Sequence, residues 1–212
     1  MDRITEAFTW PFRDPEWLSK LLIIALILLI PIVGSINGLG WMLASLDRLR
    51  AGEERLAPAN LTHIGRGIRL FAVQLIYVIG VVAVALVIFI PAFALAVRQG
   101  QGSANAALIV AAILFNLLGF SAITVLSLAL TFATPAIVLA TDRGGVGGGI
   151  QIGAVVRRSR MNVSHTLIAG LMLIAASFVG SLGIIVCGVG ALMTSAYALA
   201  MQAWIIHSFD KG

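Results

Sequence analysis

Charge is missing from most of this chain. No Asp, Glu, Lys or Arg occurs in residues 21–46, 70–97, 99–141 or 161–209, which together make up about two thirds of the 212 residues. Each of these runs is longer than the roughly 20 apolar residues that a helix needs to cross a bilayer. Only 11% of the residues are charged, against about 25% in soluble domains, and the mean hydropathy is +1.04. The composition therefore predicts an integral membrane protein.

Several kinds of chemistry have no sequence basis here. Cys187 is the only cysteine, which excludes an intramolecular disulfide and a metal site built from several cysteines. The sequence has no HExxH, GxSxG, GxGxxG or GxxxxGK[ST] motif, and its histidines, His63, His165 and His207, are far apart. We therefore expect no catalytic residues, no metal and no cofactor, and we interpret the chain as a protein that is not an enzyme.

The uncharged runs also limit transport chemistry. An ionisable side chain inside a membrane is a functional hypothesis by default, and these runs contain none apart from histidine. Proton-coupled transport and carboxylate ion relays are therefore not expected.

Two sets of residues within the runs are candidate sites. The polar positions could line a substrate path or hydrogen-bond between helices, and the small residues could let helices pack closely. The polar positions are Asn37, Gln74, Asn116 and Gln202, and the small residues are Gly34, Gly38, Ser177 and Ser181.

The predicted fold is all-α, a polytopic helical membrane bundle forming a single integral membrane domain. Five hydrophobic segments are expected, with a short interfacial helix near 150–160, where Ile152, Val155 and Val156 fall on one helical face. Segment 104–140 exceeds the bilayer thickness, so we expect a tilt, a kink or a projecting end near Pro135. The segments are 18–46, 68–97, 104–140, 163–185 and 190–208.

Segment 18–46 contains a proline. Pro31 removes a backbone donor and predicts a kink or break near Ile30. Two topologies remain open, a single kinked helix that crosses the membrane and two half-helices in a re-entrant hairpin. The hairpin places 13 Lys and Arg residues on one side and one on the other, whereas the crossing helix divides them 10 to 4.

Arginine is concentrated in residues 47–69 and 142–160. The positive-inside rule predicts that both loops lie on the cytoplasmic side of the cytoplasmic (inner) membrane.

Residues 142–149 are rich in glycine and predict a flexible stretch, and the aromatic arm of residues 8–17 predicts an interfacial foot. The expected partners are the lipid bilayer and its anionic head groups, with no nucleic acid. Candidate head-group contacts are Arg48, Arg50, Arg157, Arg158 and Arg160.

Several local patterns resemble the prokaryotic membrane family called domain of unknown function 4013. The resemblance covers nearly the whole chain and implies a polytopic protein of the cytoplasmic membrane, with no assigned reaction, ligand or functional residue. The glycine-rich stretch at 144–149 departs from the connector expected in that family. The patterns are the aromatic arm 8–17, Ile30 to Gly34, Gly40 to Leu43 with Arg48 and Arg50, Gly52 to Glu54 with Pro58, Gly65 to Leu70, Pro135, Ala154 to Arg157 with Asn162, and Tyr197 to His207.

Two functions compete at this point. One is a non-enzymatic scaffold or accessory subunit that associates with other membrane proteins or with itself, which the packing motifs favour. The other is a small permease or lipid-handling protein that uses the broken first segment, because interrupted helices often build substrate sites.

Overall fold

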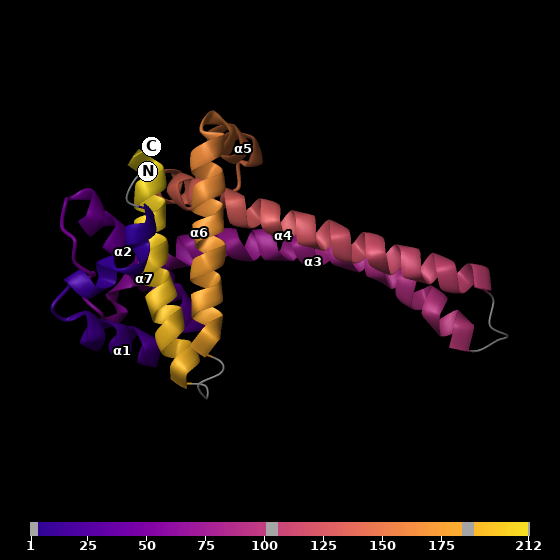
Figure 1. Ribbon diagram of the computed structural model, residues 1–212, viewed down its shortest axis with the longest axis horizontal. Helices are drawn as coiled ribbons and strands as arrows, with labels where there is room; N and C mark the ends of the chain where they lie inside the picture. Colours follow the sequence, from indigo (N-terminus) through magenta and orange to yellow (C-terminus); the bar gives the residue numbers. More distant parts are fainter. Residues whose placement is uncertain (1–3, 101–105, 184–188, 212) are drawn as a thin grey trace. The chain divides into compact units, whose positions relative to one another are not determined.

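The computed structural model describes residues 4–100, 106–183 and 189–211, and within these ranges the chain is helical and contains no strand (Figure 1). The predicted all-α class is confirmed. The α-helices are α1 (Trp17–Leu28), α2 (Pro31–Arg50), α3 (Ile64–Gly100), α4 (Ala106–Gly149), α5 (Ile152–Met161), α6 (Val163–Leu182) and α7 (Val189–Lys211). Short 3₁₀ helices are η1 (Ile4–Phe8), η2 (Trp10–Arg13) and η3 (Leu61–His63).

Three helical stretches in the described ranges are long and apolar enough to cross a membrane: Leu61–Leu95, Ala106–Gly149 and Val163–Leu182. Two predicted segments do not meet this standard. The second half of predicted segment 18–46 corresponds to α2, and predicted segment 190–208 corresponds to α7. Both helices carry polar and small residues, and both are largely buried.

The chain divides into two compact units. Unit 1 comprises residues 1–73 and 131–212, and unit 2 comprises residues 74–130. Unit 2 is an antiparallel pair made from parts of α3 and α4, in which Phe89 meets Phe120 edge-on at 5.4 Å and Gly119 lies against the Ile88 and Phe89 side chains. Most other large apolar side chains of this pair are exposed, including Val87 at 74% and Phe93 at 72%. Such a surface is compatible with lipid or with helices of another protein.

Unit 1 is organised around α7. Figure 1 shows α6 and α7 side by side, with α1 and α2 also packed on α7. Alanines at 196, 200 and 203 are fully buried on α7, and Ala169 and Ala176 are fully buried on α6. Small side chains allow the helix backbones to approach closely, and the larger Met201 and Ile205 fill the remaining space.

The break predicted near Ile30 is present. Helix α1 ends at Leu28, Ile30 has an extended backbone, and Pro31 begins α2 at a position where its missing N–H costs nothing. Gly34 lies directly against the Ile27 carbonyl, so the two helices touch at the break. The first segment is therefore two helices packed on each other and not one continuous kinked helix.

The structure bears on three local expectations. In the arm, Trp10 is fully buried against Trp204 and donates its indole N–H to the Ala200 carbonyl at 3.1 Å, whereas Phe12 is 49% exposed, and the interfacial foot stays a prediction. Residues 142–149, which were expected to be flexible, are the end of α4, and the backbone leaves helical geometry at Gly145 (φ +62°). Pro135 lies inside the same helix, and a tilt, kink or projecting end near it stays a prediction. Gly149 then packs against Thr141 and Val73 too closely for any side chain, whereas a Cβ atom at Gly144 or Gly147 would meet nothing within 4 Å.

Gly67 is the closest contact between α2 and α3, and it gives a direct test of this packing. A Cβ atom at Gly67 would strike the Ile36 carbonyl oxygen, whereas a Cβ atom at Gly65 would meet nothing within 4 Å. We expect Gly67→Ala to destabilise the protein by about 1–3 kcal/mol through overpacking. Gly65→Ala, the matched control, should be neutral or stabilising by up to about 1 kcal/mol. Unfolding midpoints in detergent measure both, and equal midpoints for the two variants would contradict the packing described here.

Candidate functional site

Seven charged side chains of unit 1 meet in one network, here called the Arg–Asp cluster. They come from five different helices, and 160 residues of sequence separate the outermost hydrogen-bonded pair. The members are Asp47 and Arg50 on α2, Arg66 on α3, Asp142 and Arg143 on α4, Arg158 on α5 and Asp210 on α7.

Arg50 and Arg66 link the first half of the chain to the second. Arg50 donates to Asp142 Oδ2 at 2.7 Å and to Asp210 Oδ2 at 3.1 Å. Arg66 donates to Asp142 Oδ1 at 2.6 Å and also to both oxygens of Asp47. Asp142 is thus held between two guanidinium groups, which suits a carboxylate whose side chain is only 8% exposed.

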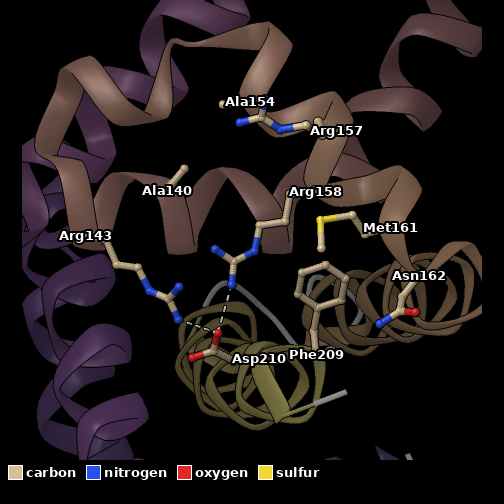
Figure 2. A pocket seen from close by; sticks show the side chains of 9 residues that line it. All are labelled: Ala140, Arg143, Ala154, Arg157, Arg158, Met161, Asn162, Phe209 and Asp210. Atoms are coloured by element: carbon tan, nitrogen blue, oxygen red, sulfur yellow. Dashed lines mark hydrogen bonds and ion pairs between the residues drawn. The ribbon is translucent and has the colours of Figure 1, made fainter.

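Asp210 completes the cluster. Its Oδ1 atom accepts hydrogen bonds from Arg143 at 2.8 Å and Arg158 at 2.9 Å, and Figure 2 shows both guanidinium groups converging on it. With Arg50 on Oδ2, one carboxylate holds three arginines from three helices. The side chain of Asp210 is 14% exposed, so the loss of its charge would leave those arginines partly desolvated and mutually repelling.

Arginine is in excess at this site. Burial, together with repulsion from Arg143 and Arg50, lowers the pKa of Arg158, and the attraction of Asp210 does not compensate. The cluster contains four arginines and three aspartates, which gives it a formal charge of +1.

A second buried charge fixes the N-terminal arm. Asp14 is 1% exposed and accepts hydrogen bonds from Lys20 Nζ at 2.8 Å, from the Leu56 N–H at 2.9 Å and from the Glu16 N–H at 2.8 Å. Burial alone would raise the pKa of Asp14, but these donors outweigh it and lower the pKa below its ordinary value. Arg13 also pairs with Glu54, so the arm and residues 54–56 are joined.

The candidate head-group arginines have different environments. Arg50 and Arg158 belong to the Arg–Asp cluster, and Arg48 donates to the Leu56 carbonyl at 3.2 Å. Arg157 and Arg160 are exposed on α5 and pair with no carboxylate in the described part of the chain. Only these two of the five candidates present an uncommitted charge.

The candidate polar positions do not form one set. Asn37 is fully buried in unit 1, where its amide donates to the Asn60 carbonyl at 2.9 Å and its Oδ1 atom has no partner among the described residues. Gln202 is half-buried in the same unit. Gln74 and Asn116 belong to unit 2, and the Asn116 amide donates to Ala112 in its own helix at 2.9 Å.

The small residues divide similarly. Gly34 packs on α1, and Gly38 lies against Leu199 of α7 and Leu28 of α1. Ser177 and Ser181 are exposed on α6, where Gly180 is the residue that approaches α7. Association between chains through these serines stays a prediction.

Sequence reasoning missed the acidic half of the Arg–Asp cluster, although a signal was available. Asp47, Asp142 and Asp210 each stand immediately after an uncharged run. An acid at the end of an apolar helix needs a cationic partner nearby. The structure supplies that partner mainly from other helices, because Asp142 pairs with Arg50 and Arg66 and not with the Arg143 that follows it.

The cluster borders a cavity of about 480 Å³ between the last part of α4, α5, the start of α6 and the end of α7 (Figure 2). Its polar lining is Arg143, Arg157, Arg158, Asn162 and Asp210, and its apolar lining is Ala140, Ala154, Met161 and Phe209. Among the described residues, no group of three or more His, Cys, Asp or Glu side chains could hold a metal ion.

Comparison with known proteins gives one match. A family described as "Protein of unknown function (DUF4013)" matches residues 23–189. Neither a curated protein nor a solved structure matches the chain.

Replacing Asp210 tests whether the Arg–Asp cluster holds unit 1 together. Asp210→Asn leaves Arg50, Arg143 and Arg158 without their shared anion, so we expect a loss of about 2 kcal/mol, or roughly 4–8 °C in the unfolding midpoint. The matched control is Glu16→Gln, because this side chain is 69% exposed and its ion pair with Lys20 lies at the surface. A midpoint for Asp210→Asn equal to that of the control would show that the cluster contributes nothing to stability.

Proposed function

We propose, for a chain that belongs to the DUF4013 family of proteins of unknown function, a role as a non-enzymatic scaffold or accessory subunit of the cytoplasmic membrane. The observation that carries this proposal is the Arg–Asp cluster. The carboxylate oxygens of its three aspartates accept hydrogen bonds from arginines of other helices. The densest polar network in the described chain therefore joins helix ends.

A joined framework suits a protein that positions others. Five helices are tied at the cluster, and the arm is tied to residues 54–56 through Arg13 and Asp14. Charge-assisted hydrogen bonds between partly buried groups hold a fixed geometry better than exposed pairs do. Such a framework supports binding without conformational change, which is the usual requirement of an accessory subunit.

The exposed surface of unit 2 supplies the second support. Residues 74–100 and 106–130 would each span about 37–40 Å as helices, which matches a bilayer core of about 30 Å with a tilt within the usual range. Val87, Leu117, Leu118 and Val125 are among the most exposed apolar side chains of this pair. The occupant that we assign to one face of the pair is a transmembrane helix of a partner protein.

A second candidate rests on Asn37. Its buried Oδ1 atom, two turns beyond the break at Ile30, has no donor in the part of the chain that the structure describes, and an unpaired buried oxygen costs about 1–3 kcal/mol. A ligand that crosses the membrane beside the broken segment would supply that donor. In transporters, interrupted helices form substrate sites of this kind. This observation favours the permease or lipid-handling function.

A tryptophan scan of unit 2 tests the scaffold function and separates it from the second candidate. Single substitutions to Trp at Val87, Leu117, Leu118 and Val125 are introduced into the full chain, which is then purified from its own membrane in mild detergent. If a partner helix packs on one face, bulky side chains on that face should reduce the yield of one co-purifying membrane protein at least several-fold. Leu118 and Val125 lie two turns apart on one face of α4 and should respond alike, whereas Leu117 lies about 100° around the helix and should respond differently. Ile150→Trp is the control, because Ile150 is also an exposed apolar residue, at 43%, but lies outside unit 2.

Two results would contradict the scaffold function. One is a chain that purifies alone at every position of the scan. The other is a partner whose yield falls equally for Ile150→Trp and for the positions in unit 2. A chain that acts alone in reconstituted vesicles, with transport that depends on Asn37, would establish the second candidate instead.

A further inference from the structure

The cavity beside the Arg–Asp cluster has an unusual balance of charge. Its lining holds three arginines and one aspartate, which gives a formal charge of +2. Asp210 is shared further, because its second oxygen accepts a hydrogen bond from Arg50, which does not line the cavity. The carboxylate therefore neutralises only part of the positive charge around the cavity.

Each arginine retains hydrogen-bonding capacity. A guanidinium group carries five N–H donors, and Arg143 and Arg158 each contact Asp210 through a single nitrogen, Nη2. Arg157 is exposed, and no carboxylate pairs with it in the part of the chain that the structure describes. Figure 2 shows that Arg157 does not reach Asp210, in contrast to its neighbour Arg158.

Repulsion already exists within this group of arginines. Arg143 and Arg50 contribute to lowering the pKa of Arg158, as described above. An anion that entered the cavity would relieve this repulsion and would gain two or three charge-assisted hydrogen bonds. The positive charge of the arginines around the cavity is thus only partly balanced by Asp210.

The arrangement of the guanidinium donors favours phosphate as the ligand. Planar guanidinium groups bind phosphate oxygens in a bidentate manner, and several arginines can share one tetrahedral anion. We propose that this cavity binds a phosphate group, with Arg157 as the principal contact and with Arg143 and Arg158 as supporting donors held in place by Asp210.

The apolar part of the cavity indicates the source of the phosphate. Met161 and Phe209 line the cavity beside the arginines, and Met161 is 76% exposed. Ile152 and Val156 are also exposed on α5, so this short helix presents apolar and cationic side chains together, as helices at the membrane interface do. An anionic phospholipid, with its phosphate on the arginines and its glycerol region on Met161, fits both parts. A soluble phosphate ester would use the arginines alone.

The phosphate site does not depend on the scaffold function, because it is tested on the purified chain without partners. Binding of short-chain phosphatidylglycerol and, separately, of inorganic phosphate is measured by calorimetry on the full chain in neutral detergent. Arg157→Gln is compared with Arg160→Gln, which removes the same charge from the same exposed helix but does not line the cavity. Neither arginine belongs to the Arg–Asp cluster, so both variants should fold normally.

We expect Arg157→Gln to raise the Kd of phosphatidylglycerol about tenfold, the effect of losing one charge-assisted contact, and Arg160→Gln to change it less than twofold. If only inorganic phosphate binds with this dependence on Arg157, the site holds phosphate and its source is soluble. Equal effects of the two variants, or no binding of either probe, would overturn the proposal, because the first is the result of general surface charge and the second shows no site.

Discussion

The carboxylate of Asp210 accepts hydrogen bonds from Arg50, Arg143 and Arg158, and the rest of unit 1 depends on the constraint behind this arrangement. A charge at the end of an apolar helix cannot stay partly desolvated without a partner. Each of the acids Asp47, Asp142 and Asp210 ends an uncharged run, so each needs a guanidinium group from elsewhere in the chain. Satisfying all three brings α2, α3, α4, α5 and α7 to one place.

The sequence was informative where one residue determines local structure. Uncharged runs predicted helices, and Pro31 predicted the break at Ile30, because these effects act within a few residues. It was uninformative where the outcome depends on a distant partner. The sequence contained Arg50 and Arg158 but not their pairing with Asp210, and it contained Trp10 but not the Ala200 carbonyl that allows its burial. The cavity beside Arg157 has no sequence signal at all, since its lining comes from α4, α5, α7 and Asn162, the residue before α6.

The same constraint separates two uses of arginine in this chain. Arginines inside the Arg–Asp cluster pair with carboxylates and join helix ends, although they outnumber the aspartates four to three. Arg157 lies one residue from Arg158 yet has no carboxylate partner among the described residues, so its charge is available to a ligand. In the two proposals made above, one set of arginines joins helix ends and Arg157 contacts anionic head groups. The proposed scaffold and lipid-binding roles then share one cationic face.

The most direct test measures on which side of the membrane this cationic face lies. The Arg–Asp cluster joins residues 47–66 to 142–158, and Arg13 and Asp14 join the arm to residues 54–56. In a chain with Cys187 replaced, single cysteines at Thr5, Gln151 and Ser103 are labelled in sealed vesicles with a membrane-impermeant maleimide. The account predicts that Thr5 and Gln151 react from the same side and Ser103 from the opposite side. Labelling of Thr5 from the side of Ser103 would contradict it.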